Sequence, residues 1–157
     1  MAKAADIPLQ PEMTFADAAA LAVGVRAREL WEHSANVLDT RDIERVHDMR
    51  VATRRLRAVL EIFAPCFPRS EHRAVLKEVK ALADALGERR DPDVQLEHIA
   101  ELEEGMGAEA RPGLETFADR IRSEQAAGNE ALAAALHHAE EINLQGRIKA
   151  LVAEASE

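Results

Sequence analysis

The sequence predicts an all-α fold, an antiparallel bundle of about five to six helices, from three observations. Apolar residues recur at helical spacing in several long stretches, and no alternating pattern bounded by turn residues indicates a strand. The six prolines fall outside the strongly periodic stretches. Hydrophobic residues make up 47% of the chain but aromatic residues only 3%, so we expect a core of Leu, Val, Ile and Ala.

A chain of 157 residues is long enough for one domain with a substantial core. Residues 1–12 contain two prolines and no periodicity, which predicts a flexible lead-in to a single helical domain over residues 13–157. Cys66 is the single cysteine and cannot form an internal disulfide, which favours a reducing compartment. We find neither a signal-peptide core nor an apolar run near the ~20 residues that span a bilayer. A bacterial cytoplasmic protein is therefore expected.

The helices are predicted from periodicity and from residues that start or stop helices. They cover residues 15–37, 41–63, 71–86, 91–104 and 114–140, with a last short helix ending near residue 155. Thr14 and Asp17 have the spacing of a capping box. Asp39 or Thr40 is expected to cap the second helix. Gly24 lies inside the first helix and is expected to allow another helix to approach closely.

The later helix boundaries are predicted from Ser, Gly and Pro signals. Ser70 is expected to cap the third helix, and Gly87 to follow its last turn. Asp91 followed by Pro92 predicts the start of a new helix, with the carboxylate as N-cap rather than as a ligand contact. Breaks are expected at residues 105–107 and between Asn143 and Gly146.

The net charge of −9 argues against a general coat for nucleic acids, yet the charge is unevenly distributed. Residues 41–57 hold six arginines against three acidic residues, and residues 69–90 hold six basic against four acidic residues. The rest of the chain holds eight basic and twenty-two acidic residues. Two neighbouring segments are therefore cationic within an otherwise acidic protein.

The first cationic segment forms a row when it is drawn as a helix. His47, Arg50, Arg54 and Arg57 share one face, and Arg55 lies at its flank. The opposite face is apolar and predicts the side that packs into the core. Such like charges repel one another, so the row indicates a surface for an anionic ligand.

The second cationic segment repeats this design more weakly. Arg73, Lys77 and Lys80 share a face, and Arg89 and Arg90 follow at the predicted helix end. In an antiparallel hairpin, the two cationic faces are expected to border one groove. Guanidinium groups bind phosphate oxygens in pairs and lysines add point charge, whereas few aromatic side chains are available to stack on bases. The expected ligand is therefore a phosphate polymer without bases.

At these residues the sequence resembles the CHAD domain, the conserved-histidine α-helical domain. Residues 47–57, HDMRVATRRLR, resemble its first signature, and residues 86–94, LGERRDPDV, resemble its second. The resemblance implies a helical protein that binds inorganic polyphosphate through a basic surface and associates with polyphosphate granules. Some family members are fused to a catalytic domain, but none is visible in this sequence, and we expect no metal or cofactor. The contacts it implies are His47, Arg50, Arg54, Arg55, Arg57, Lys77, Lys80 and Arg90.

The resemblance covers about residues 14–140 and corresponds to the first of the two similar helical halves that family members usually have. The other histidines do not begin a second His-x-x-Arg helix. The expected alternatives are therefore a fragment, a truncated gene product, or a half-domain that forms a homodimer to complete the missing half.

Other interpretations of the same residues remain open. The arginine-rich face can pair with acidic helices instead of a ligand, and His47 can make a capping or interhelical hydrogen bond. Arg55 can pair with an acid on a neighbouring helix. The alternative function is a helical protein-interaction or dimerisation module with no polyanion ligand. An enzyme acting on phosphate polymers is disfavoured because the sequence has no metal-ligand spacing or nucleophile motif, and nucleic acid is disfavoured by the net charge.

Overall fold

The computed structural model describes residues 2–157 and confirms the predicted all-α fold. Within that range there are five α-helices, one short 3-10 helix and no strand. The elements are α1 (Phe15–Ser34), α2 (Glu44–Ile62), η1 (Ala64–Cys66), α3 (Arg69–Gly105), α4 (Arg111–Glu141) and α5 (Leu144–Ala153). None of the helices in this range is both long and apolar enough to cross a bilayer.

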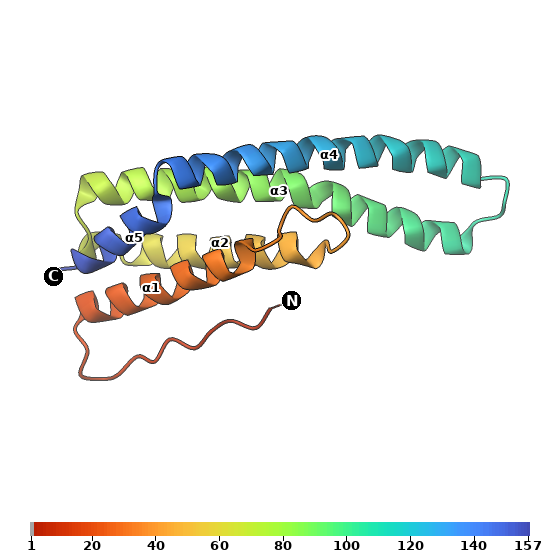
Figure 1. The fold of residues 1–157 in the computed structure, drawn as a ribbon. Helices are drawn as coiled ribbons and strands as arrows, with labels where there is room; N and C mark the ends of the chain where they lie inside the picture. Colours follow the sequence, from red (N-terminus) through yellow and green to blue (C-terminus); the bar gives the residue numbers. More distant parts are fainter. Residues whose placement is uncertain (1) are drawn as a thin grey trace.

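The helices form a body and a projecting arm (Figure 1). The body contains α1, α2, the first half of α3, the second half of α4 and the short α5, which turns back to pack on α1 and α3. Helices α3 and α4 make a long antiparallel hairpin whose far end extends beyond α1 and α2. That far end has a small core of its own, made by Ile99, Ala118 and Ile121.

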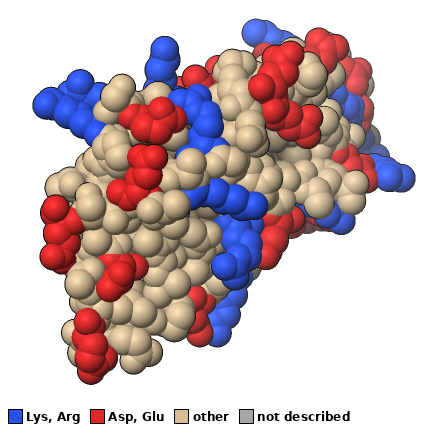
Figure 2. Space-filling view, turned by 60° about the vertical axis from the view of Figure 1, so that its left-hand side comes forward, with Lys and Arg blue, Asp and Glu red and all other residues tan. Residues whose placement is uncertain are grey.

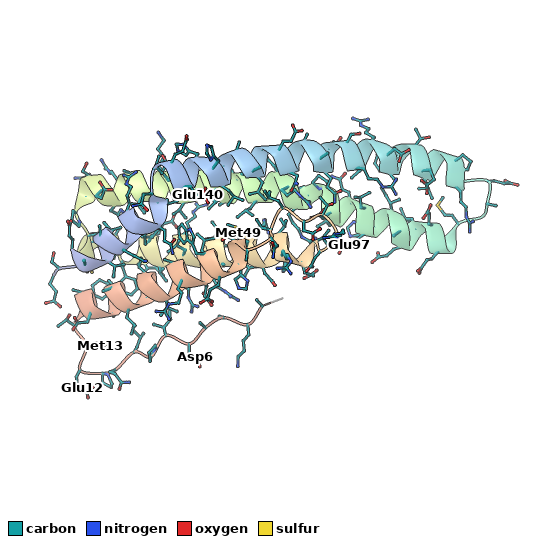
Figure 3. The ribbon with its side chains drawn as sticks, viewed as in Figure 1. Asp6, Glu12, Met13, Met49, Glu97 and Glu140 are labelled. Atoms are coloured by element: carbon teal, nitrogen blue, oxygen red, sulfur yellow. The ribbon has the colours of Figure 1, made fainter. Side chains whose placement is uncertain are left out.

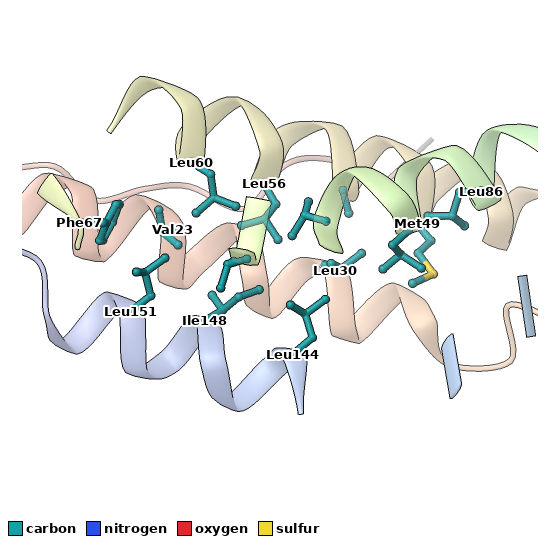
Figure 4. Packing of buried hydrophobic residues seen from close by; sticks show 14 of the residues in the cluster. Val23, Leu30, Met49, Leu56, Leu60, Phe67, Leu86, Leu144, Ile148 and Leu151 are labelled. Carbon is teal, nitrogen blue, oxygen red and sulfur yellow. The ribbon is translucent and has the colours of Figure 1, made fainter. Parts of the chain in front are cut away.

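The main core is aliphatic, as the composition predicts. Figure 4 shows Val23 and Leu30 of α1 facing Leu56 of α2 and Ile148 of α5. Figure 3 places Met49 in the interior between the helices. Burial of this apolar surface, at roughly 25 cal/mol per Å², is the main force holding the body together.

Helix α3 corrects the predicted boundary between a third and a fourth helix. Residues 71–86 and 91–104 belong to one helix of 37 residues, with Gly87, Asp91 and Pro92 in its interior. Asp91 is therefore not an N-cap, and Gly87 does not end a helix. Gly87 and Pro92 do not end the helix here, because α3 packs against α4 on both sides of the proline. Tertiary packing outweighs the low helix propensity of these two residues.

A close approach of α4 accompanies this interior proline. Pro92 has no N–H to donate to the carbonyl of Glu88, one helical turn earlier. A Cβ atom added to Gly128 would lie 3.3 Å from that carbonyl oxygen and 3.2 Å from the Cα of Arg89. Glycine is therefore the residue that fits where α4 crosses α3. Gly24, in contrast, has nothing within 4 Å of such a position and does not mediate the expected close approach.

Two predicted boundaries after α1 also require correction. Helix α1 ends at Ser34 instead of residue 37, and α2 begins at Glu44 with no side-chain cap. Neither Asp39 nor Thr40 caps it, because Asp39 accepts hydrogen bonds from Arg41, at 2.9 Å from Nε and 2.8 Å from Nη2. The Asp39 carboxylate, which was expected to cap the start of α2, is instead occupied by the Arg41 side chain.

The other boundaries agree more closely with the sequence. The capping box of Thr14 and Asp17 is present. Helix α3 begins at Arg69 after Pro68, so Ser70 is not its cap. It ends at Gly105, one residue beyond the predicted end at 104 and at the start of the predicted break. The predicted break before the last helix is confirmed at Asn143, where φ is 51° and the side chain accepts a hydrogen bond from the Gly146 backbone.

The lead-in runs along the body without forming a helix, passing Asp6, Glu12 and Met13 (Figure 3). Its Ala2 N–H donates to Asp48 Oδ1 at 2.8 Å, and its Ala5 N–H donates to Glu29 Oε1 at 2.5 Å. Arg26 Nη1 donates to the Ala5 carbonyl at 3.0 Å. These hydrogen bonds tie the lead-in to α1 and α2, while its flexibility stays a prediction.

Candidate functional site

Helix α2 separates its apolar and cationic side chains as the helical projection predicts. Met49, Leu56 and Leu60 are buried in the core. Arg54 and Arg57 are exposed and Arg50 is half-buried on the other side. We call Arg50, Arg54 and Arg57 the arginine row. Their spacing places one guanidinium on each successive turn of a single helix.

The arginine row lines one wall of a groove of about 480 Å³ between α2 and α3. The groove is bounded by Arg50, Arg54, Arg57, Ala83, Asp84, Gly87, Glu88 and Asp91. The predicted groove between these two helices is thus present, but its second wall differs from expectation. Asp84, Glu88 and Asp91, which we call the acidic wall, stand where a second cationic wall was expected.

The antiparallel pairing of α2 and α3 explains this difference. One face of α3 carries basic residues near the helix start and acidic residues further along. Arg73, Lys77 and Lys80, which we call the basic end, therefore lie beyond the groove, near the end of α2. The acidic wall was not among the predicted site residues. Treating α3 as one helix would have extended its projected face from Lys80 through Asp84 to Asp91.

Glu61 joins the arginine row to the basic end. Its Oε1 lies 3.0 Å from Arg57 Nε on the same helix and 3.4 Å from Lys80 Nζ on α3. The hydrogen bond from Arg57, with the Arg57 charge and Lys80, holds the pKa of Glu61 below its usual value. Glu61 is therefore an anion that reduces the positive potential where the two basic sets meet. Arg73 and Lys77 are exposed and have no ion pair within the described residues.

Arg55 points away from the arginine row, toward α1. Its positive charge helps to stabilise the ionised form of Glu29, a buried carboxylate of α1. Burial alone raises the pKa of Glu29, but the hydrogen bonds from Ala5 and Arg26, with the charges of Arg26 and Arg55, outweigh it and hold the pKa below its usual value. Arg55 thus acts on a neighbouring helix, as its flank position allowed.

Arg89 does not lie on the groove. Its side chain is fully buried between α3 and α4, where Nη1 donates to Asp93 Oδ1 at 2.6 Å and Nε donates to Asn129 Oδ1 at 3.1 Å. Gln125 Nε2 also donates to Asp93 Oδ1, at 2.6 Å. Arg89 therefore connects the two long helices, and a ligand in the groove does not reach it.

Arg90 and His47 are only partly accessible. The Arg90 side chain is 12% exposed, and its Nη2 lies 3.8 Å from Glu97 Oε2. His47 is half-buried one turn before Arg50, and its imidazole makes no hydrogen bond with any described residue. The capping and interhelical roles considered for His47 therefore have no counterpart among residues 2–157.

A space-filling view shows how charged side chains are distributed over one face of the molecule. In Figure 2, basic side chains gather in a column down the middle of the visible face, beside a broad uncharged area with acidic groups mostly toward its margins. The described residues contain no group of three or more His, Cys, Asp or Glu that could hold a metal ion. The chemistry that this surface offers is charge pairing and hydrogen bonding to an anion.

Comparison with known proteins places most of the chain in one family model. The family model for the CHAD domain matches residues 22–157, which is most of the chain. No curated protein and no solved structure matches. The matched region contains the arginine row, both walls of the groove and the basic end.

Proposed function

The chain belongs to the CHAD domain family, which is associated with polyphosphate binding, and on this premise we propose that it is a non-catalytic module that binds inorganic polyphosphate. In this proposal the polymer lies on the arginine row and continues over the basic end. Arg90 and His47 contribute only through their accessible atoms. Arg89 and Arg55 are left out of the contact surface, because Arg89 is buried against α4 and the charge of Arg55 stabilises Glu29 of α1.

The observation that carries the proposal is the arginine row itself. Three arginines occupy successive turns of α2 and line one groove wall, and only Arg57 has an ion pair with a described residue. Like charges at this spacing destabilise an isolated helix by a few tenths of a kcal/mol per pair. An anionic ligand that bridges them removes this repulsion.

Polyphosphate fits the chemistry of the row. Each guanidinium can bind two phosphate oxygens in parallel, and a polymer presents such oxygens at every unit. Around the groove the wall residues are charged or small, with no aromatic ring to stack on a base. Binding is driven by release of counterions, so affinity is expected to fall steeply with salt.

The test is a binding measurement on paired double variants. We expect Arg50→Ala/Arg54→Ala to abolish a gel shift with long-chain polyphosphate at ~0.15 M salt while leaving the thermal unfolding temperature nearly unchanged. The control is Arg120→Ala/Arg122→Ala, which removes two exposed arginines of α4 and the same amount of charge. Equal binding by the two double variants would refute the assignment of the ligand to the arginine row.

Two further measurements define the role of the module. A fluorescent fusion is expected to localise at polyphosphate granules, and the Arg50→Ala/Arg54→Ala fusion is expected to lose that localisation. Incubation with polyphosphate is expected to release no orthophosphate. Steady release that disappears in the same double variant would show an enzyme instead of a binding module.

A second candidate function is an interaction or dimerisation module, and one observation favours it. Helices α1 and α5 border a groove of about 340 Å³ whose lining combines Gly24, Ala27, Ile148 and Val152 with the polar side chains of Arg28, Gln145 and Lys149. Such a groove can receive an apolar strip from a second helix. Sedimentation over a range of protein concentrations tests self-association through it, and a monomer at every concentration would exclude a homodimer.

A further inference from the structure

The two walls of the α2–α3 groove carry opposite charge in equal number. Arg50, Arg54 and Arg57 stand on α2, and the three carboxylates of the acidic wall stand on α3. Residues 84, 88 and 91 are spaced i, i+4 and i+7, so they share one face of α3. A polyanion that enters this groove therefore meets repulsion as well as attraction.

The acidic wall does not neutralise the arginines by direct pairing. Within the described residues no ion pair of 4.0 Å or less joins the two walls, and the one pair made by the arginine row is Arg57 with Glu61 of its own helix. All three carboxylates are exposed. The guanidinium groups remain available to a ligand, while the carboxylates act on it through space.

The charge along this face of α3 reverses between Lys80 and Asp84. Toward the helix start, the basic end offers a cationic surface beside Glu61. A single flexible chain of phosphates can lie against the arginine row and then turn toward the basic end. It can thereby keep its charges away from the acidic wall.

A nucleic acid duplex does not have this freedom. The axes of packed helices lie about 8–10 Å apart, whereas the major groove of a B-form DNA duplex alone is about 12 Å wide. A duplex is therefore too broad to enter between α2 and α3, and it rests on both walls. Its phosphates then meet the carboxylates of α3 together with the arginines of α2.

We infer that Asp84, Glu88 and Asp91 form a selectivity element that admits a single phosphate chain and disfavours double-stranded DNA. This inference rests on the proposed function, since it concerns the same groove. The acidic wall lowers the affinity for a DNA duplex more than it lowers the affinity for a single phosphate chain. Discrimination by a repulsive group of this kind is a general route to specificity.

The experiment compares two ligands and two charge-matched variants. The test variant is Asp84→Asn/Glu88→Gln/Asp91→Asn, which keeps the side-chain shapes and removes three negative charges. The control is Glu101→Gln/Glu104→Gln/Glu109→Gln, which removes three exposed carboxylates around the far end of the arm. Fluorescence anisotropy measures the binding of long-chain polyphosphate and of double-stranded DNA with a matched number of phosphates.

We expect the test variant to bind double-stranded DNA about tenfold more tightly than the wild type does. Its affinity for polyphosphate should rise by less than about threefold. Both values follow from screened repulsion by three nearby charges. The control variant is expected to change both affinities by the same small factor. Equal gains for the two ligands, or gains no larger than those of the control, would overturn the selectivity role. Failure of the wild type to bind polyphosphate would instead refute the proposed function, and the inference with it.

Discussion

Replacing Arg89 by methionine should destabilise the protein by about 3–5 kcal/mol, because it leaves the carboxylate of Asp93 buried without its charge partner. Both side chains are fully buried, and Arg89 Nη1 lies 2.6 Å from Asp93 Oδ1. After the change Asp93 keeps only the hydrogen bond from Gln125, and its Oδ2 has no partner within the described residues even now. Such a loss is a third or more of the stability of many domains, which is often near 10 kcal/mol.

The exposed pair of Arg57 and Glu61 provides a matched comparison. Its side chains are 45% and 43% exposed, so solvent screens the attraction, and Arg57→Met should cost less than about 1 kcal/mol. The double variant Arg89→Met/Asp93→Leu removes both buried charges. It should recover most of the stability lost in Arg89→Met, because apolar residues can replace a buried pair at little cost.

Urea and thermal unfolding followed by circular dichroism would measure these differences. For a domain of this size we expect Arg89→Met to lower the unfolding temperature by roughly 6–20 °C. The reasoning fails if Arg89→Met costs no more than Arg57→Met. It also fails if the double variant is less stable than the single one.

Three other predictions follow from packing, from a buried acid and from the single thiol. Gly24→Ala should stabilise the protein by about 0.5–1 kcal/mol through helix propensity. Gly128→Ala should destabilise it, because the added Cβ would lie 3.2–3.3 Å from the backbone of α3. Urea unfolding compares the two variants, and a gain in stability from Gly128→Ala would contradict the close crossing of α3 and α4. Because the pKa of Glu29 is lowered on folding, its contribution to stability is complete above about pH 4.5, the ordinary value, and is lost as the pH falls through the lower folded value. Glu29→Gln should weaken this acid dependence and reduce the hydrogen-exchange protection of Ala5, and unchanged protection would count against the anchoring role. Burial, and to a smaller extent the charge of Glu157, raises the pKa of the Cys66 thiol. Thiol reagents should therefore label Cys66 far more slowly in the native protein than in the unfolded one. Equal labelling rates would show that Cys66 is accessible to solvent in the native protein.

Much of the fold could be predicted because helical signals are local. The capping box at Thr14, the end of α3 at Gly105 and the turn at Asn143 depend on residues within a few positions of each other. The same holds for the two faces of α2, where a period of 3.6 residues separates arginines from core residues. These features would arise in many tertiary contexts, and the sequence is enough to find them.

The errors occur where packing overrides a local signal. Gly87 and Pro92 disfavour a helix on their own, yet α3 continues through them because α4 packs along both sides. Arg89 was grouped with surface arginines because its sequence neighbours are basic. Its burial follows from Asp93, Gln125 and Asn129, and the last two belong to another helix.

The sequence by itself determined that this protein is helical, belongs to the CHAD domain family and presents a row of arginines on one helix face. Only the tertiary structure decided what faces that row. The antiparallel pairing of α2 with an uninterrupted α3 sets Asp84, Glu88 and Asp91 opposite the arginines and moves Lys80 beyond the groove. Helical periodicity is a property of neighbouring residues, whereas the relative rotation and register of two helices depend on how their apolar faces fill a shared core.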